Sequence, residues 1–173
     1  MIKASIDIGS NSVLLLVVEL HSDEMKELAN ETRITSLGRE LDKTKMFHTQ
    51  SMLDTYGALQ DYHEIIKSFG IEPSEVIVTA TEASRVAQNA SEFFKKIKND
   101  MGFRVTTISG EGEAYYTAYG VTKEILSVDP TVTIMDIGGA STEFIKVKLS
   151  PFSILDSVSL PVGSVRATDW LSD

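Results

Sequence analysis

Two short segments of this sequence combine a carboxylate with small and hydroxyl-bearing residues. Ile6-Asp7-Ile8-Gly9-Ser10-Asn11-Ser12 has the same arrangement as Met135-Asp136-Ile137-Gly138-Gly139-Ala140-Ser141, 129 positions later. Each predicts a strand ending near Asp, a tight turn and a second strand. Such a turn offers backbone N–H groups and hydroxyls to phosphate oxygens, and the aspartate can hold Mg²⁺ directly or through water. One copy alone is more often an ordinary hairpin; the duplication favours a phosphate site.

Three further charged residues could take part in such chemistry. Glu113 follows Ser109-Gly110 at a predicted helix start, where it either caps the helix or positions a water molecule. Glu143 lies in a stretch destined for a core, so it needs a partner such as a metal or an arginine, unless the strand end is solvent-exposed. Arg85 begins a helix, where it either serves an anion or pairs with Glu82 on the surface.

The elements that must position these residues follow from the hydrophobic pattern. Strands are predicted at 2–8, 13–20, 26–37, 75–81 and 103–108, helices at 49–69, 84–100 and 111–126, and a charged loop at 38–47. The order βββαβαβα indicates an α/β fold with parallel crossovers and helices covering the sheet.

The pattern restarts after a polar break at residues 127–130. Strands are predicted at 132–137, 142–148 and 152–160, and a helix begins at 163–171. We therefore expect a first unit at 1–126 and the beginning of a second, similar unit at 127–173. At 173 residues the chain is long enough for the first unit but leaves the second incomplete.

Composition narrows the function further. The net charge of −9, from 25 acidic and 16 basic residues, argues against broad nucleic-acid binding or attachment to an anionic membrane. The longest apolar run has six residues, Val13 to Val18, too few to span a bilayer, and no signal peptide is visible. The absence of cysteine excludes thiolate zinc sites and cysteine nucleophiles, and the three histidines have no ligand spacing. We expect a cytoplasmic protein.

Five motifs, in order and spread along the whole chain, resemble those of the exopolyphosphatase and guanosine pentaphosphate phosphohydrolase (Ppx/GppA) family. They are Ile6 to Ser12, Thr79-Ala80-Thr81-Glu82-Ala83-Ser84-Arg85, Ile108-Ser109-Gly110-Glu111-Gly112-Glu113-Ala114, Asp136 to Glu143, and Leu160-Pro161-Val162-Gly163-Ser164-Val165-Arg166. This family belongs to the actin, sugar-kinase and heat-shock-chaperone superfamily. The resemblance implies a ribonuclease H-like (actin-like ATPase) lobe with a mixed sheet flanked by helices, followed by the start of a second such lobe.

The resemblance also implies roles for individual residues. Catalytic roles fall on Glu113, which would activate the attacking water, and on Glu143. Phosphate-binding roles fall on Asp7, Gly9, Ser10, Asn11, Arg85, Gly138, Gly139 and Ser141, and metal-binding roles on Asp136, Glu143 and Asp7. Two positions depart from the family pattern: Ala140 replaces a glycine, and Gly112 stands where glutamate is usual. Either change could alter rate or substrate choice.

The implied activity is Mg²⁺-dependent hydrolysis of the terminal phosphoanhydride of inorganic polyphosphate or guanosine pentaphosphate, and the motifs do not separate these two substrates. No membrane or specific nucleic-acid partner is expected, and a homodimer of the full-length protein is left open. Two alternatives stay open: a kinase-like ATPase of the same superfamily, and a non-catalytic module that binds a phosphate ligand. Whether 173 residues suffice for activity is also left open.

Overall fold

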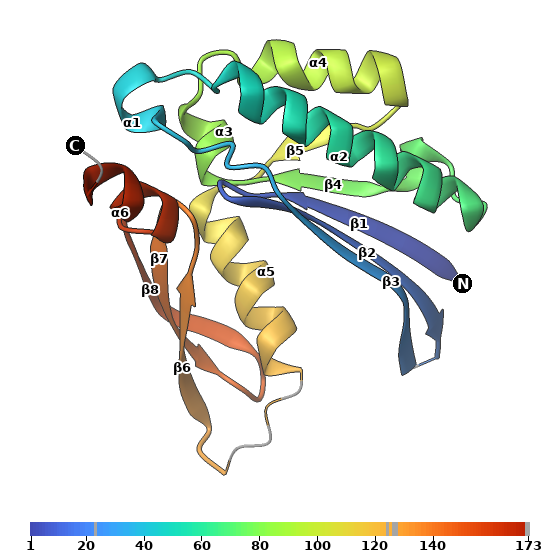
Figure 1. The fold of residues 1–173 in the computed structure, drawn as a ribbon. Coiled ribbons are helices and arrows are strands. Elements are labelled where there is room, and N and C mark those ends of the chain that lie inside the picture. Colours follow the sequence, from blue (N-terminus) through green and yellow to red (C-terminus); the bar gives the residue numbers. More distant parts are fainter. Residues whose placement is uncertain (23, 124, 126–127, 172–173) are drawn as a thin grey trace.

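A computed structural model describes residues 1–22, 24–123, 125 and 128–171, and it contains two β-sheets (Figure 1). The larger sheet has the order β3-β2-β1-β4-β5. Its strands are β1 (Ile2–Ile8), β2 (Ser12–His21), β3 (Glu24–Ile34), β4 (Ile77–Ala80) and β5 (Val105–Thr107). The first three are antiparallel, whereas β1, β4 and β5 are parallel. The predicted mixed sheet of an α/β fold is confirmed.

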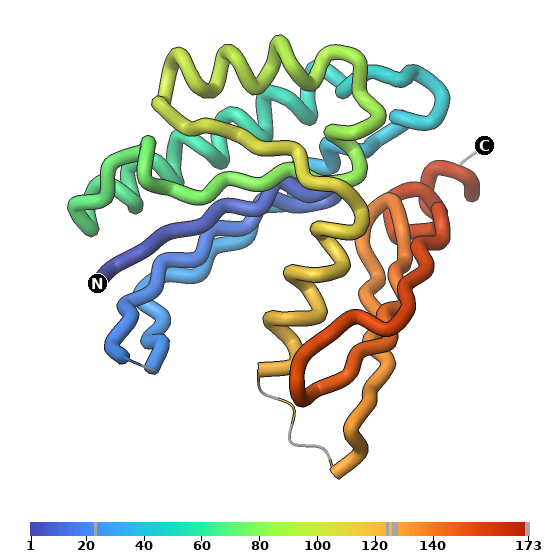
Figure 2. The backbone as a smooth tube through the Cα atoms, turned by 180° about the vertical axis from the view of Figure 1, so that it is seen from behind, coloured from blue at the N-terminus to red at the C-terminus, as the bar shows by residue number. Residues whose placement is uncertain are grey.

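Helices α2 (Thr49–Ser68) and α4 (Ala90–Met101) lie together over one face of this sheet (Figures 1 and 2). Alternate residues of β1 and β2 point into the core beneath them, as the period of two in a strand requires. Tyr62 of α2 is fully buried, and its hydroxyl donates to the carbonyl of Val13 at 2.9 Å. A short 3₁₀ turn, Pro73–Glu75, leads into β4.

Two local expectations were wrong. The single helix predicted at 84–100 is two helices, α3 (Glu82–Val86) and α4. The helix is interrupted between them, where the side chain of Asn89 hydrogen-bonds the backbone of Phe47. The predicted loop at 38–47 contains a short helix, α1 (Leu41–Thr44), which buries Leu41. In both places contacts between distant segments decide the local structure.

The smaller sheet has the order β6-β7-β8 and is entirely antiparallel. Its strands are β6 (Thr131–Ile137), β7 (Thr142–Lys148) and β8 (Ser153–Leu160), and α6 (Ser164–Leu171) follows. Helix α5 (Gly110–Thr122) packs on one face of it, with Ala114 and Ala118 in the same cluster as Ile145. The helix was expected to continue to 126, but it ends at Thr122, and the described residues Lys123 and Ile125 are not helical; residues 124, 126 and 127 lie outside the described part. The division at 126 stays a prediction.

The other face of the smaller sheet is exposed and largely apolar. Met135 is 58% exposed, Ile137 62% and Phe144 36%. Met135 lies opposite Phe144, which in turn lies opposite Val158 of β8, so these side chains form a row across the strands.

Among the described residues, no helix combines the length and the apolar character needed to cross a membrane.

Candidate functional site

The two duplicated segments form matching β-hairpins. The strand pairs β1–β2 and β6–β7 have the same register relative to their turns. In both turns the N–H of the first glycine donates to the carbonyl of the serine three residues later, Gly9 to Ser12 and Gly138 to Ser141, at 2.9 Å in each case. The repeat in the sequence is therefore also a repeat of backbone geometry.

The two turns touch each other. A Cβ placed on Gly139 would lie 3.0 Å from the backbone N and the Cβ of Asn11, and 3.1 Å from the Cβ of Ser10. Such distances are shorter than ordinary van der Waals contact, so the close approach of the turns depends on a residue without a side chain at Gly139.

Each turn is held from behind through its carbonyl groups. The carbonyls of Ser10 and Asn11 accept hydrogen bonds from backbone N–H groups of residues 35–38, at 2.7–3.0 Å. The carbonyls of Gly138 and Gly139 accept from the first turn of α6 at 2.8–3.1 Å. Strand β3 ends before the predicted residue 37 because the backbone of residues 35–38 leaves the sheet and hydrogen-bonds the turn between β1 and β2.

A cavity of about 150 Å³ lies between the two hairpins. One water molecule needs on the order of 10–15 Å³ of such space, so the cavity has room for a phosphate group with water. Nine of the predicted site residues line it: Asp7, Gly9, Ser10, Asn11, Glu113, Asp136, Gly138, Gly139 and Ser141. Arg85 and Glu143 are not in the lining. A larger hollow of about 740 Å³ shares Asp7, Glu113 and Asp136.

The 150 Å³ cavity is acidic. Four carboxylates line it, from Asp7, Glu82, Glu113 and Asp136, and none of the described lining residues is Lys, Arg or His. A phosphate group entering this space would meet like charge on several sides, which a cation would have to offset.

Asp7 and Asp136 occupy corresponding positions at the ends of β1 and β6. Burial raises the pKa of Asp7, the charge of Asp136 adds to this, and the hydroxyl of Thr79, which donates to it at 2.9 Å, acts in the opposite direction. Burial also raises the pKa of Asp136, and its cross-strand neighbour Glu143 raises it further. Both carboxylates therefore gain from a neighbouring positive charge.

Glu143 is buried, with 8% of its surface exposed. Its carboxylate accepts a hydrogen bond of 2.7 Å from the hydroxyl of Ser159 on β8. The alternative that Glu143 sits at a solvent-exposed strand end is therefore wrong. Its observed partner is a hydroxyl rather than an arginine.

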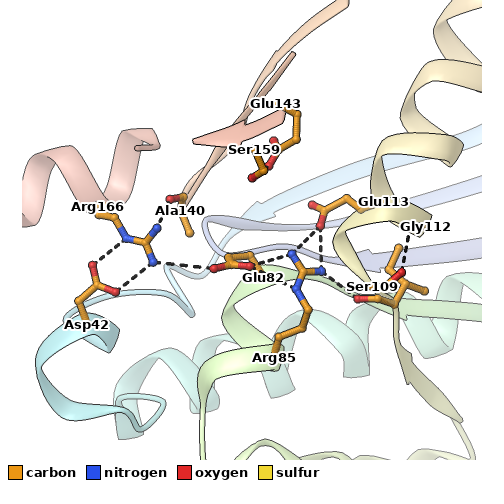
Figure 3. Close-up of polar contacts among 11 residues, drawn as sticks. Asp42, Glu82, Arg85, Ser109, Gly112, Glu113, Ala140, Glu143, Ser159 and Arg166 are labelled. Carbon is orange, nitrogen blue, oxygen red and sulfur yellow. Dashed lines mark hydrogen bonds and ion pairs between the residues drawn. The ribbon is translucent and has the colours of Figure 1, made fainter. Parts of the chain in front are cut away.

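Glu113 lies in the first turn of α5, but it does not cap the helix. The cap is the side chain of Ser109, whose oxygen accepts from the N–H of Gly112 at 3.1 Å. The carboxylate of Glu113 instead accepts from both terminal nitrogens of Arg85, at 3.0 Å each (Figure 3). Burial raises the pKa of Glu113, whereas Arg85 lowers it.

Arg85 forms the pair with Glu82 that was one of the two alternatives for it, and its role toward a phosphate anion stays a prediction. Its guanidinium bonds Glu82 at 2.8 and 3.2 Å, as the surface-pair alternative requires, and also contacts Glu113 and the carbonyl of Ile108. Burial lowers its pKa, but the hydrogen bonds to the two glutamates outweigh this, so the net shift is upward. To bind phosphate, Arg85 would have to exchange one of these partners.

Comparison with known proteins places this geometry in a family. The model of the Ppx/GppA phosphatase family matches residues 16–173. The chain belongs to this family. The bifunctional 3-dehydroquinate synthase/phosphatase of Fusobacterium nucleatum is 35% identical over 177 residues, covering 97% of this chain and 26% of that protein. Exopolyphosphatase 2 of Mycobacterium tuberculosis is 31% identical over 175 residues, covering 96% of this chain and 53% of that protein.

Solved structures of similar proteins have the same fold. The Aquifex aeolicus family member has a TM-score of 0.80 and 34% identity, covering 98% of this chain and 54% of that one. An exopolyphosphatase from Cytophaga hutchinsonii has a TM-score of 0.90 and 28% identity, covering 98% and 53%. The chain thus spans about half the length of these structures and of the curated exopolyphosphatase.

The donor set of this Ppx/GppA site fits a hydrated magnesium ion better than a closed metal cage. No group of three or more His, Cys, Asp or Glu side chains in the described residues is arranged to hold a metal. Mg²⁺, however, usually keeps several waters and uses one or two carboxylates. Asp136 and Glu143 are direct cross-strand neighbours, and Asp136 lies near enough to Asp7 for its charge to raise the pKa of Asp7.

Sequence reasoning missed several contacts of the site. The hydroxyl of Ser159 and the ion pair between Asp42 and Arg166 were not predicted. Arg166 belongs to the fifth motif and could have been singled out there. Asp42 carries no such signal, because it lies in a segment expected to be a charged loop.

Proposed function

We propose that this chain forms the catalytic cleft of a hydrolase that releases the terminal phosphate of inorganic polyphosphate or guanosine pentaphosphate. The main support is the meeting of two matching turns at one acidic cavity, with Glu113 in its wall. The similarity to an exopolyphosphatase supports the same reaction class. The match covers about half of that protein, so activity is proposed for the protein as a whole.

In this proposal the turns hold the phosphate oxygens that do not react. Their backbone N–H groups are neutral donors already in place, so they need no reorganisation when charge moves during the reaction. The carbonyl anchors behind both turns support this role, because they fix the peptide planes that carry those donors.

The metal would be held by Asp136 and Glu143, with Asp7 on the other side of the cavity. When bound, Mg²⁺ would neutralise charge on the transferring phosphoryl group. The acidic lining supports this requirement, since these side chains alone would repel a polyanion.

Glu113 would orient the attacking water and accept its proton. A base of this kind works best when its pKa approaches the working pH, and burial moves the pKa of Glu113 in that direction. Its contact with Arg85 fixes the carboxylate and leaves one oxygen free of that contact. The acceptor of the phosphoryl group is then water.

The test measures phosphate release from both substrates, with Mg²⁺ and with a chelator. Replacing a general base costs about 10²–10⁴-fold in rate, which we expect for Glu113→Gln. Glu111→Gln is the matched control, because Glu111 is in the same helical turn but exposed. Full Mg²⁺-dependent release by Glu113→Gln would refute the assignment. Transfer to an acceptor other than water would favour the kinase-like alternative, and activity only in a longer version of the protein would show that these residues form half of the site.

A further inference from the structure

The fifth motif, residues 160–166, has no role in the proposed reaction. It leads into α6 and ends at Arg166, whose side chain is only 10% exposed. Arg166 belongs to the lobe of the smaller sheet, yet its guanidinium reaches Asp42 in α1 of the first lobe. The distances are 2.7 Å from Nε to Oδ2 and 3.0 Å from Nη2 to Oδ1, a two-point contact.

The same guanidinium also fixes the second turn. Its Nη1 donates to the carbonyl of Ala140 at 2.6 Å. A second link lies beside it, where the backbone N–H of Glu40 donates to Asp169 at 2.9 Å. The space left at this seam is about 10 Å³, too small to hold a water comfortably. The lobes therefore meet here through direct contacts.

Arg166 is also the first member of a row of alternating charges that ends at Glu113 (Figure 3). Its Nη2 lies 4.0 Å from one oxygen of Glu82. The other oxygen of Glu82 accepts from Arg85 at 2.8 Å, and Arg85 contacts Glu113 at 3.0 Å. Glu82 thus stands between two arginines, one from each lobe.

We infer that Arg166 is a positioning residue that clasps the two lobes across the cleft and, through Glu82 and Arg85, holds the carboxylate of Glu113 in place. The two-point contact with Asp42 and the bond to Ala140 set the position of the second turn relative to the first lobe. The contact with Glu82 is the longest link, so the clasp acts on Glu113 mainly by fixing where Glu82 can lie. Only the predicted effect on rate rests on the proposed function.

The clasp itself can be tested without any enzyme assay. The sequence has no cysteine, so spin labels on Lys67→Cys and Asp156→Cys, one exposed position in each lobe, report the distance between lobes. We expect a narrow distribution in the parent, and a shifted or broadened one with Arg166→Gln. Asp42→Asn should change it in the same way while leaving the bond to Ala140, and it carries the test if Arg166→Gln does not fold. Arg33→Gln, which breaks a pair within β3, is the control. Unchanged distributions in both clasp variants would overturn the inference.

The rate test uses a preparation that releases phosphate. A misplacement of about 1 Å can cost as much as ~10²-fold, so we expect Arg166→Gln to lower kcat by about 10-fold or more with a smaller change in KM. Arg166→Lys should recover little of the lost kcat, because lysine cannot contact Asp42 at two points and Ala140 as well. An unchanged kcat, or full rescue by lysine, would overturn the positioning role. If the parent shows no hydrolysis, the proposed function fails while the spin-label result still decides the clasp.

Discussion

Gly163 offers a sharp test of how the second turn is supported. It is buried between β8 and α6, immediately behind that turn. A Cβ at this position would lie 2.5 Å from the carbonyl carbon and oxygen of Gly139 and 2.6 Å from the N of Ala140. All three are backbone atoms, which cannot swing aside as the end of a long side chain can. Gly163→Ala must therefore displace the turn or α6 by on the order of 1 Å to reach ordinary contact distances.

The size of the effect follows from this displacement. Forcing an extra methyl group into a packed region costs about 1–3 kcal/mol. In a chain of this size each kcal/mol lowers the unfolding midpoint by about 2–4 °C, so we expect the midpoint of Gly163→Ala to lie about 2–12 °C below that of the parent. If the turn moves by about 1 Å, phosphate release should fall by up to ~10²-fold.

Thermal unfolding, followed by circular dichroism, and a phosphate-release assay check both effects. Gly57→Ala is the control, because a Cβ there meets nothing within 4 Å and Gly57 lies within α2. It should stabilise the fold slightly, since alanine is the better helix former by about 1 kcal/mol. If Gly163→Ala keeps the parent midpoint and the parent rate, the close contact behind the turn is not what positions it.

Three further changes have expected outcomes. Burial raises the pKa of Asp136, so ionisation of this carboxyl destabilises the folded state. This free-energy cost is absent below the pKa of the unfolded state, ~3.9, and grows as the pH rises towards the pKa of the folded state. Without metal, Asp136→Asn should therefore have a higher thermal unfolding midpoint than the parent at about pH 7 but not at about pH 3. Equal unfolding midpoints at neutral pH would contradict this. Tyr62→Phe removes the hydroxyl that donates to the buried carbonyl of Val13 and should cost about 0.5–1.5 kcal/mol in urea unfolding; a loss below the error of the measurement would contradict it. Ser159→Ala removes the hydrogen bond to Glu143 and should raise the Mg²⁺ concentration for half-maximal phosphate release by about 10-fold, with an unchanged Mg²⁺ curve as the contrary result.

Much of the fold could be predicted because most elements follow a local pattern. The strands that begin each half have the alternation or the apolar run expected of them, and glycine ends α4 where predicted, with Gly102 at φ 80. The exceptions arise where a distant segment competes for the backbone. Asn89 could continue a helix by propensity, but its side chain bonds Phe47, 42 residues earlier, and the helix breaks there. Spacing along the chain contains no record of such a contact.

The candidate site was predictable to the extent that it is a repeat. Asp7 and Asp136 could be paired by comparing the two segments, before any three-dimensional information. The partner of Glu143, Ser159, and the clasp of Arg166 could not be found in this way. The first depends on the pairing of β7 with β8, and the second on how the second sheet sits against the first lobe, since Asp42 and Arg166 are 124 residues apart.

The exposed apolar row on the smaller sheet indicates which part of the molecule unfolds locally first. Shifted by the repeat, Met135, Ile137 and Phe144 correspond to Ile6, Ile8 and Leu15, each at most 1% exposed beneath α2 and α4. The first sheet thus has its helical cover on the face where the second has solvent. Regions with few buried apolar contacts open at lower free energy than the rest. Amide hydrogens of β6–β8 should accordingly exchange well before those of β1 and β2. The two sides of the cleft thus differ in local stability, with β1 and β2 on the more stable side. A ligand bound by both turns would slow amide exchange mainly in β6–β8.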